Sequence, residues 1–504
     1  MRAAERLPVQ FNAAEWFIGR HAREGRGDAL ALVTADRSLT YAELDRDVRA
    51  FAAAITAAGV RRGDRVAFVA PDDLPLAIGF WGTIAAGAVA VPINTLLKPH
   101  DHAAILADCD PRLVVLDPRI AARAVAPEDA AVWDVAEVPT RIAAAEPAAR
   151  YASTHRDAFA FFLYSSGTTG EPKGVVHLQH DMWIAAETYG TEVLGIRPDD
   201  RCFSVAKIFF AYGLGNSLYF PAHVGAATAL MADRPTPEAI FAAVKRHRPT
   251  LFFAVPTAYA NLLAAIDAGA DADFSSVRLS VSAGEALPAS LFERWKARTG
   301  TEILDGIGST EICHIFLSNR PGACVPGSTG TPVPGYDLRL VDETGTDVPD
   351  GELGDLLVRG DSTMALYWNK HEATKHALRG DWIRTGDKYY RDERGNYFHG
   401  GRSDDMIKAG GIWVSPVEVE GALISHEDVV ECAVVRSPDE GGLMKPHAFV
   451  VLREGRERRR HRSAPQVLRQ RAPRALQTPR WVTVVSELPK TATGKIQRFL
   501  LRAR

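Results

Sequence analysis

The sequence predicts an α/β protein with a large N-terminal domain of layered α/β subdomains, a β-rich subdomain, and a small C-terminal domain. Three observations lead to this prediction. Helix-like and strand-like patterns alternate along the chain as far as Gly327. Beyond Gly327, short apolar runs are separated by Gly, Asp and Pro turns, and the polar, glycine-flanked segment 400–405 then interrupts the pattern. We therefore expect two domains, residues 1–401 and residues 402–504.

Length and composition narrow the class of protein. A chain of 504 residues is too long for one compact core, and 46% hydrophobic with 24% charged residues is ordinary for a soluble globular enzyme. The formal net charge of -3 gives no reason to expect a polyanionic partner. Five scattered cysteines without a CxxC pair suggest neither a disulfide framework nor a zinc site. The N-terminus has no signal-type apolar core and the chain no long apolar run, so we expect a cytoplasmic protein without membrane or nucleic-acid partners; a homodimer stays open.

The first predicted helix shows how the N-terminal elements are recognised. Thr40 precedes an alanine-rich helical pattern and Glu43 follows three residues later, which is the signature of a capping box. Further along, helical patterns alternate with short apolar runs, and this alternation is typical of a largely parallel sheet covered by helices. A β-rich subdomain is predicted after them from the strand-like runs 336–341 and 355–359. The predicted helices are 39–59, 74–86, 237–246 and 288–299, and the predicted strands are 65–70, 88–93, 158–163, 250–255, 277–282 and 302–304.

An unusual segment lies near the C-terminus. Between Arg453 and Arg480 there are ten arginines and three prolines, with little amphipathic periodicity. Three interpretations stay open: a solvated basic surface, a locally altered reading frame, and a nucleic-acid patch, for which the usual aromatic platforms are missing.

The strongest chemical signal is the segment from Tyr164 to Gly174. It places four Ser and Thr hydroxyls, three glycines and a lysine behind an apolar strand and before a helical pattern. Glycines allow backbone N–H groups to approach a phosphate closely, hydroxyls add hydrogen-bond donors, and the lysine adds positive charge. The spacing of a Walker loop is missing, because Pro172 stands where that motif would continue. We therefore predict a phosphate-binding loop of another kind, formed by Ser165, Ser166, Gly167, Thr168, Thr169, Gly170 and Lys173.

This loop closely resembles the phosphate loop of the adenylate-forming superfamily, which includes the acyl-CoA synthetases, and further motifs follow in the family's order. Segment 306–311 resembles the family segment that packs on adenine, in which Thr310 would contact phosphate and Glu311 would hold Mg²⁺. Thr385-Gly386-Asp387 resembles the motif whose aspartate binds the ribose hydroxyls, with Arg402 beside it. By the same resemblance, the nucleotide site also includes Gly284, Glu285, Asp305, Gly306 and Ile307.

The resemblance also implies roles for the C-terminal domain, which it predicts to be α+β and mobile. Asp404 matches the hinge about which this domain swings, and Gly410 and Gly411 match the channel for the pantetheine arm of coenzyme A. Segment 489–495 resembles the terminal motif whose last residue, Lys495, reaches the carboxylate and the α-phosphate. The predicted catalytic residues are therefore Lys495, Thr310 and Glu311, and the predicted cofactors and co-substrates are ATP, Mg²⁺ and coenzyme A.

Segment 205–216 indicates which acid is activated. Adenylation domains for amino acids normally place an Asp there to pair the substrate's ammonium, whereas this segment offers apolar and aromatic residues. Aromatic side chains such as Tyr212 suit a flat ring. Together with segments 282–288 and 306–319, it resembles benzoate– and hydroxybenzoate–CoA ligases, in which the aryl carboxylate would contact Ala211, Tyr212, Gly308, His314 and Ile315. His314 has a second interpretation, that of a packed structural histidine.

The resemblance thus implies an ATP-dependent ligase that joins benzoate or a hydroxybenzoate to coenzyme A through an acyl-adenylate, releasing AMP and pyrophosphate. An aminobenzoate and a short or cyclic aliphatic acid stay open as alternative substrates. A carboxylate and ATP carry charge of the same sign, so bringing them together requires cations. The candidates are Lys173, Lys495 and an Mg²⁺ held by Glu311.

Overall fold

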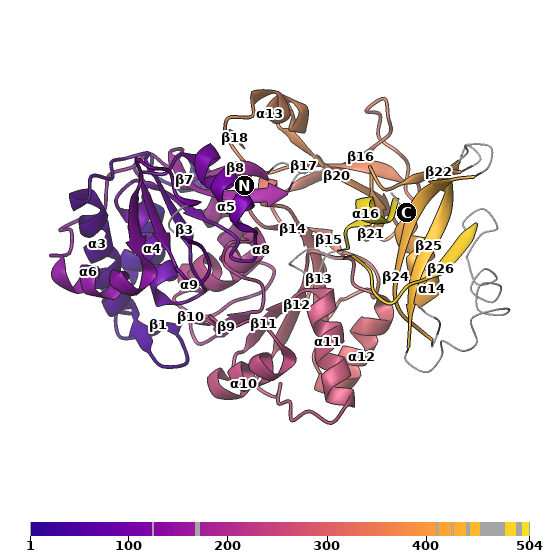
Figure 1. Cartoon of the computed structure of the whole chain (residues 1–504), viewed down its shortest axis with the longest axis horizontal. Coiled ribbons are helices and arrows are strands. Elements are labelled where there is room, and N and C mark those ends of the chain that lie inside the picture. The colour runs from indigo at the N-terminus through magenta and orange to yellow at the C-terminus, as the bar shows by residue number, and fades with distance from the viewer. Residues whose placement is uncertain are drawn as a thin grey trace.

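The computed structural model describes residues 2–122, 125–166, 172–409, 412–424, 426, 428–439, 444–453, 479–489 and 496–502 (Figure 1). These residues form two large sheets, a smaller antiparallel sheet and a group of C-terminal strands. Some predicted features lie outside the described residues, so the predictions made for them stay predictions. They are Gly167, Thr168, Thr169 and Gly170 of the phosphate loop, the glycines Gly410 and Gly411, the terminal Lys495, and residues 454–478 of the arginine-rich segment.

The first large sheet has nine strands, and its central neighbours run parallel, as the alternation of helices and strands predicts. Antiparallel pairs occur towards both ends, where β2 and β14 join. In spatial order the strands are β15 (Thr331–Pro332), β14 (Ile315–Ser318), β13 (Ile303–Gly308), β12 (Leu279–Ser282), β11 (Leu251–Ala254), β9 (Arg201–Ser204), β10 (Ala227–Ala229), β1 (Leu30–Val33) and β2 (Ser38–Thr40).

The second large sheet has seven strands and combines a parallel part with an antiparallel end. The antiparallel end contains the strands on either side of the predicted phosphate loop. In spatial order the strands are β18 (Leu366–Tyr367), β8 (Pro172–Leu178), β7 (Phe159–Ser166), β4 (Val89–Pro92), β3 (Arg65–Val69), β5 (Leu113–Leu116) and β6 (Ala131–Asp134).

One expectation about the phosphate loop is wrong. The sequence pattern suggested a helix directly after the loop, but the chain instead returns as strand β8, antiparallel to β7. The consecutive β-branched residues Val175 and Val176 are buried and pair with Leu163 and Phe162 of β7, which favours a strand over a helix. The helix α7 (Asp181–Ala185) begins only after this hairpin is complete.

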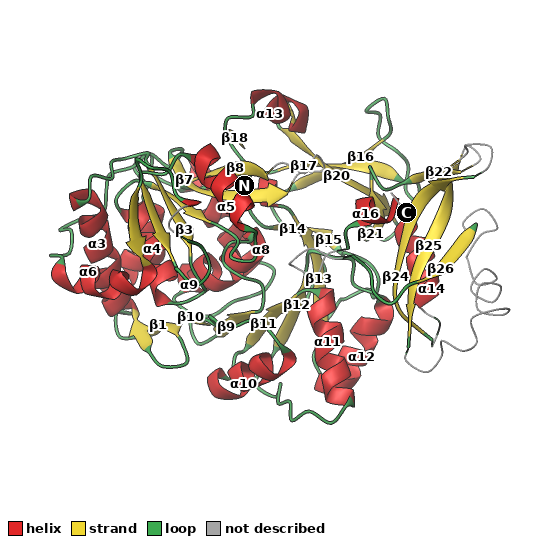
Figure 2. Ribbon diagram, viewed as in Figure 1, coloured by secondary structure: helices red, strands yellow, loops and turns green. Residues whose placement is uncertain are grey.

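Both large sheets are buried on their two faces, which gives the N-terminal part its layers. On β11, Leu251 and Phe253 pack into a core that also contains residues of the other large sheet, whereas Phe252 and Ala254 pack on the opposite side. This alternation follows from the two-residue period of a strand. The outer side is covered by the helices seen beside this sheet in Figure 2, α10 (Pro237–His247), α11 (Pro256–Asp267) and α12 (Ala289–Thr299).

The helix α3 (Tyr41–Ala57) begins as predicted, with a capping box. Thr40 Oγ1 accepts a hydrogen bond from the Glu43 N–H at 3.3 Å, and Glu43 Oε2 accepts one from the Thr40 N–H at 2.8 Å. The other helices of this part are α1 (Ala3–Arg6), η1 (Glu15–Gly19), α2 (Arg20–Arg23), α4 (Leu74–Ala85), α5 (Pro99–Cys109), η3 (Val135–Glu137), α6 (Val138–Ala144), η4 (Ala186–Thr191), α8 (Ala211–Leu214), η5 (Gly215–Tyr219), α9 (Phe220–Val224) and η6 (Thr310–Ile312).

The predicted β-rich part is an antiparallel sheet that follows the layered region. It contains β16 (Asp337–Val341), β17 (Gly354–Arg359), β20 (Trp382–Arg391) and β19 (Leu378–Arg379), with β21 (Tyr397–Arg402) paired to β20 and the helix α13 (His371–Ala377) beside it. The final strands and helices lie at the other end of the molecule from α3 and α4 (Figure 1). They are β22 (Ile407–Ala409), β23 (Ile412–Val414), α14 (Pro416–Ile424), β24 (Val429–Pro438), β25 (Met444–Leu452), β26 (Trp481–Val484) and α16 (Arg498–Arg502).

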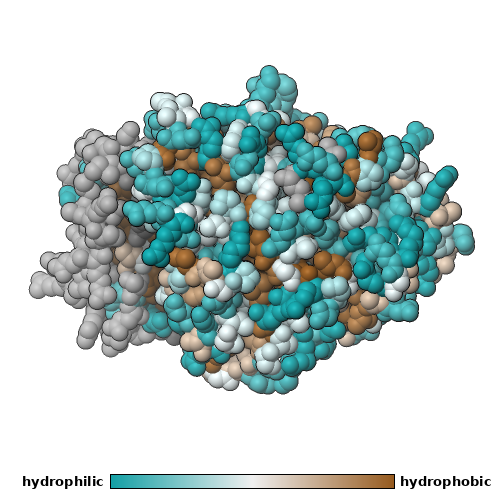
Figure 3. Space-filling model, turned by 180° about the vertical axis from the view of Figure 1, so that it is seen from behind, coloured by the Kyte–Doolittle hydropathy of each residue, from teal (hydrophilic) through white to brown (hydrophobic). Residues whose placement is uncertain are grey.

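The predicted fold class is confirmed: a large α/β N-terminal part precedes a smaller C-terminal part that contains both helices and strands. Hydrophilic residues cover much of the face seen in Figure 3, with hydrophobic residues in groups between them. Among the described residues, no helix has the length and apolar character required to span a bilayer.

Candidate active site

The part of the candidate site that was predicted to bind phosphate is built on the β7–β8 hairpin. Its register pairs Ser165 with Lys173 and Ser166 with Pro172, so the strand residues on either side of the predicted loop stand opposite each other. The Lys173 ammonium lies 5.3 Å from the centre of the Tyr367 ring, which is within the range of a cation–π contact. Tyr367 belongs to β18, which pairs with β8.

The neighbouring turn, η6, carries Thr310 and Glu311 and is held from two strands. His177 of β8 has one ring nitrogen, Nε2, 2.7 Å from the Thr310 carbonyl oxygen. Tyr367 Oη donates a hydrogen bond of 2.8 Å to Glu311 Oε1, and the Met364 N–H donates one of 2.7 Å to the Glu311 carbonyl oxygen. Backbone and side chain of this turn are therefore fixed separately.

An ion pair between the buried Asp387 and the partly exposed Arg402 lies beside this turn, on β20 and β21. Asp387 is directly opposite Arg402 in the strand register, and Arg402 Nη1 is 3.2 Å from both carboxylate oxygens. Burial alone would raise the pKa of Asp387, but the hydrogen bond from His399 and the charge of Arg402 outweigh burial and hold this pKa below its usual value. Asp387 is therefore a carboxylate at neutral pH, with a cation next to it.

The strand β13 carries the segment predicted to pack on adenine. Asp305 is opposite Ser282 of β12, and its backbone oxygen accepts a hydrogen bond of 2.9 Å from the Asn319 N–H. Burial raises the pKa of the Asp305 carboxyl well above its usual range, and its Oδ1 has no hydrogen-bond partner within the described part of the chain. A side chain at Gly306 would begin 3.0 Å from Ile315 Cγ2, so this strand also passes close to β14.

The predicted nucleotide residues Gly284 and Glu285 lie in the connection between β12 and α12. Gly284 has a φ of +94°, a conformation that favours glycine. Thr257 contacts Oε2 of Glu285 from both its N–H, at 3.2 Å, and its hydroxyl, at 2.8 Å. The Glu285 carboxylate therefore ties this connection to α11.

A third group of predicted residues forms an aromatic wall at the start of α8. Tyr212 follows Ala211 and donates a hydrogen bond from its hydroxyl to the Val281 carbonyl at 2.9 Å. This bond turns the polar end of Tyr212 towards the strand β12. The His314 ring packs 5.7 Å from the Tyr212 ring, centre to centre, and His314 Nε2 is 3.1 Å from the Tyr212 carbonyl oxygen.

Two glycines lie very close to His314, Gly308 to its backbone and Gly215 to its ring. Gly308 is paired with Ile315 across β13 and β14, and a side chain at Gly308 would begin 2.5 Å from the His314 carbonyl oxygen. A side chain at Gly215 would begin 2.4 Å from His314 Cδ2. Only glycine fits at both positions, since real side-chain carbons do not approach other atoms so closely.

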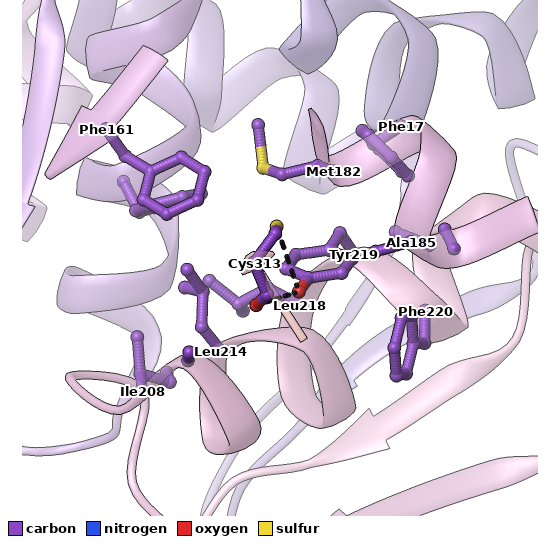
Figure 4. Packing of buried hydrophobic residues seen from close by; sticks show 14 of the residues in the cluster. Phe17, Phe161, Met182, Ala185, Ile208, Leu214, Leu218, Tyr219, Phe220 and Cys313 are labelled. Carbon is purple, nitrogen blue, oxygen red and sulfur yellow. Dashed lines mark hydrogen bonds between the residues drawn. The ribbon is translucent and has the colours of Figure 1, made fainter. Parts of the chain in front are cut away.

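His314 is a neutral, packed side chain. Burial lowers its pKa to about 3. Because the Tyr212 carbonyl can only accept, Nε2 carries the ring hydrogen, and Nδ1 is an acceptor with no partner among the described residues. The preceding residue, Cys313, has a φ of +71°, and its carbonyl oxygen accepts a hydrogen bond from Tyr219 Oη at 3.3 Å (Figure 4).

The predicted hinge follows directly after β21. Asp404 is exposed, and its carbonyl oxygen is 3.4 Å from Arg502 Nη2 of the C-terminal helix α16. Arg502 also forms an ion pair with Asp405. The helix α16 is therefore attached to the segment that follows Arg402.

The described site residues are thus carried by three different sheets, and the hydrogen bond from Tyr367 to Glu311 links the seven-stranded sheet to the turn η6. The sequence did not single out His177, Tyr367 or His399, although each contacts a residue that it did single out. No short motif marks these three side chains, because their role arises from strand pairing between distant segments.

Comparisons with known proteins identify the class of protein that this fold and site define. Residues 19–368 match the model of the AMP-binding enzyme family, and residues 418–495 match that of the AMP-binding enzyme C-terminal domain. The chain belongs to the AMP-binding enzyme family.

Within the family, the chain is similar to ligases of aromatic acids. The benzoate–CoA ligase of Thauera aromatica is 44% identical, over 99% of this chain and 97% of that protein. The 4-hydroxybenzoate–CoA/benzoate–CoA ligase of Rhodopseudomonas palustris is 41% identical, over 98% and 95%. Among solved structures, the anthranilate CoA ligase AuaEII in complex with anthranoyl-AMP has a TM-score of 0.92 at 40% identity, covering 100% of this chain and 98% of that one. A benzoate CoA ligase from Burkholderia xenovorans LB400 has a TM-score of 0.89 at 45% identity, covering 98% and 100%.

Proposed function

We propose that the protein joins an aromatic carboxylate, benzoate or a hydroxybenzoate, to coenzyme A and converts ATP to AMP and pyrophosphate. The observation that carries this proposal is the wall formed by Tyr212 and neutral His314 beside the strand β13. The aromatic faces of this wall suit a flat ring. The backbone of β13 leads into the turn that carries Thr310 and Glu311. The acid and the nucleotide would therefore meet at this strand.

The nucleotide half of the proposal rests on four described side chains. The Asp387 carboxylate, paired with Arg402, is a hydrogen-bond acceptor for the ribose hydroxyls. The unpartnered Oδ1 of Asp305 is an acceptor suited to the adenine amino group. Lys173 supplies positive charge on the hairpin that leads into the predicted phosphate loop.

The residues present also fit a magnesium ion. Glu311 offers a carboxylate, the ligand type that Mg²⁺ prefers, and Mg²⁺ is commonly held by one or two carboxylates together with substrate phosphates. Tyr367 occupies only one of the two carboxylate oxygens. When bound, Mg²⁺ would offset the negative charge of the phosphates and so favour approach of the carboxylate.

The proposed reaction has two steps. In the first, an oxygen of the aryl carboxylate attacks the α-phosphorus of ATP, a new P–O bond forms, and pyrophosphate leaves. Lys495 would stabilise the oxygens that gain negative charge, and Thr310 would hold the phosphate in position. In the second step, the thiol of coenzyme A attacks the acyl carbon as a thiolate, and AMP leaves with the bonding electron pair.

The second step requires a different arrangement of the C-terminal residues. We propose residues 402–504 as a separate domain that turns at Asp404, with Gly410 and Gly411 lining the pantetheine channel. The large β21–β20 pairing ends at Arg402, and the final strands form their own sheet, β24–β25–β26. Both observations support a boundary at this point.

A panel of acids read by AMP formation tests the proposal. Benzoate, its hydroxy and amino isomers, cyclohexane carboxylate and hexanoate are each offered with ATP and coenzyme A. We expect AMP and aryl-CoA to appear in equal amounts with the flat aromatic acids, and much less product with cyclohexane carboxylate and hexanoate. ADP in place of AMP, or a preference for hexanoate, would refute it.

An aminobenzoate is a second candidate substrate, favoured by one observation. The unpartnered, buried Nδ1 of His314 is an acceptor that could take a hydrogen bond from a ring amine or hydroxyl. The variant His314→Phe distinguishes the candidates: it should lower kcat/KM for an amino or hydroxy acid more than for benzoate. If kcat/KM falls equally for all three acids, His314 does not bind a ring substituent, and benzoate stays the preferred candidate substrate.

A further inference from the structure

Tyr367 lies between two charged groups of the candidate site, Glu311 of the turn η6 and Lys173 of the strand β8. Its hydroxyl is 2.8 Å from Glu311 Oε1, and its ring centre is 5.3 Å from the Lys173 ammonium. The side chain is only 7% exposed, so both contacts are made out of bulk water. The hydroxyl of Tyr367 therefore contacts the Glu311 carboxylate, and the face of its ring contacts the Lys173 ammonium.

The position of Tyr367 is set by the backbone. β18 pairs with β8 in an antiparallel register that places Tyr367 opposite Val175, two residues from Lys173. The Tyr367 N–H donates a hydrogen bond of 3.0 Å to Thr374 Oγ1 of α13. Phenolic oxygen, ring and backbone thus have separate partners, and the side chain has little freedom to turn.

We propose that Tyr367 is a positioning residue for the nucleotide–metal site, holding the Glu311 carboxylate with its hydroxyl and the Lys173 ammonium with its ring face. This inference rests on the proposed function, because it takes Glu311 as a magnesium ligand and Lys173 as a phosphate contact. Tyr367 itself touches neither substrate nor metal in this assignment.

The physical effect of the hydroxyl is to orient the carboxylate. The O–H donates to one oxygen of Glu311, and no hydrogen bond from the described residues reaches the other oxygen, which stays available to a cation. Without this bond, the carboxylate would have to lose rotational freedom at the moment when the metal binds. The Tyr367 hydroxyl orients the Glu311 carboxylate before the metal binds.

The backbone beneath Glu311 is fixed by an independent contact, which keeps the hydroxyl effective. His177 is fully buried, its Nε2 donates to the Thr310 carbonyl, and its Nδ1 lies 2.7 Å from Asp181 Oδ2. Its ring stacks on Phe161 at 4.9 Å. The backbone of the turn is therefore held from β8, so that at Glu311 the Tyr367 hydroxyl acts on the side chain alone.

The test compares Tyr367→Phe with Tyr367→Leu. Phenylalanine keeps the ring face against Lys173 and removes the hydroxyl, whereas leucine removes both. Binding of a non-hydrolysable ATP analogue is measured by calorimetry, with Mg²⁺ titrated and with EDTA. We expect Tyr367→Phe to raise the Mg²⁺ concentration needed for half-maximal binding by about tenfold and to leave the metal-free affinity unchanged, because orienting partners of metal ligands have effects of this size. Tyr367→Leu should weaken metal-free binding as well.

Tyr41→Phe is the matched control. Tyr41 is also buried and also donates from its hydroxyl, at 2.7 Å to the Ala226 carbonyl, but it lies at the start of α3. Its loss should affect stability without changing the magnesium dependence. If Tyr367→Phe behaves like Tyr41→Phe, or weakens binding equally with Mg²⁺ and with EDTA, the proposed role is wrong.

A double-mutant cycle provides a second readout. In a Glu311→Ala background, Tyr367→Phe should have no further effect on the magnesium dependence, since the group it orients is gone. An unchanged tenfold effect in that background would overturn the inference. Since these measurements contain no acid, they also separate the inference from the proposed function. A protein inactive on every acid in the panel could still show the effect.

Discussion

Burial sets the direction of the pKa shift for two ionisable side chains in the candidate site and is outweighed at a third. It raises the pKa of Asp305 and lowers that of His314 to about 3. Asp387 is the exception, because His399 and Arg402 outweigh its burial and lower its pKa. At neutral pH the His314 side of the candidate site is thus uncharged, while Asp387 and Arg402 form an ion pair.

The buried neutrality of His314 predicts how stability depends on pH. An unfolded histidine binds a proton near pH 6.5, whereas the folded His314 stays neutral to about pH 3, so its contribution is complete above pH 6.5 and is lost as the pH falls towards 3. At pH 5 the loss should be about 2 kcal/mol, at about 1.4 kcal/mol for each pH unit. Urea denaturation at pH 8 and pH 5 should therefore show a smaller pH effect in His314→Phe.

His21 provides an internal comparison for this experiment. Burial lowers the pKa of His21 to about 4, so it contributes in the same direction and is present in both proteins. The pH effect should be reduced in His314→Phe and not abolished. An identical pH effect in the two proteins would show that the folded His314 accepts its proton as readily as the unfolded one.

Elements that are defined by nearby residues could be predicted from the sequence, whereas elements that depend on pairing with distant strands could not. The capping box of Thr40 and Glu43 lies within four residues, so the start of α3 was predictable. The strand β8 was mistaken for part of a helical pattern because its partners, β7 and β18, give it its conformation through ladders that no short window contains. The contact of Tyr367 with Glu311 was missed for the same reason.

The C-terminal elements allow a prediction about stability. Arg498 of α16 donates to both carboxylate oxygens of Glu420, at 2.9 and 2.8 Å, and Glu420 Oε1 also accepts from the Val434 N–H of β24 at 2.7 Å. Arg498→Met would leave a buried carboxylate without its cation, which costs about 3–5 kcal/mol. Amide hydrogen exchange should become faster in β24 while β11 keeps the parent's rate.

An exposed ion pair serves as the control for this change. Arg359 contacts Asp337 at 2.7 Å, but both side chains are about half exposed or more, at 48% and 61%. Arg359→Met should change stability by less than about 1 kcal/mol, because exposed pairs contribute little. Equal effects of the two substitutions would mean that the Glu420–Arg498 pair does not hold the C-terminal elements together.

For the whole molecule, the sequence predicted the fold class and the family, and both are confirmed. Ordered motifs spread over nearly the whole chain made this possible, since each motif alone is weak. The individual roles of the site residues stay predictions. Lys495, Gly410 and Gly411 in particular lie outside the described residues, and their assignment rests on the resemblance alone.

A two-step assay tests the division of labour between the two parts of the chain. Lys495→Ala should lower aryl-adenylate formation by about 10²–10³-fold, since one group that stabilises developing charge contributes this much. Thioester formation from supplied aryl adenylate should change little. Lys490→Ala, in the same segment, is the control and should leave both steps near the parent's rates. Equal losses in both steps for Lys495→Ala would contradict its assignment to the first step.

The register of the β7–β8 hairpin has a consequence for how this site can vary. Ser165 and Lys173 are paired in the antiparallel register of β7 and β8. The backbone position of Lys173 is therefore set by this strand pairing and not by the length of the connection between the strands. Residues could be inserted into that connection, or removed from it, without displacing Lys173 from its neighbour. The strand pairing thus fixes the backbone position of Lys173 by itself, whereas the connection keeps the separate, predicted role of binding phosphate.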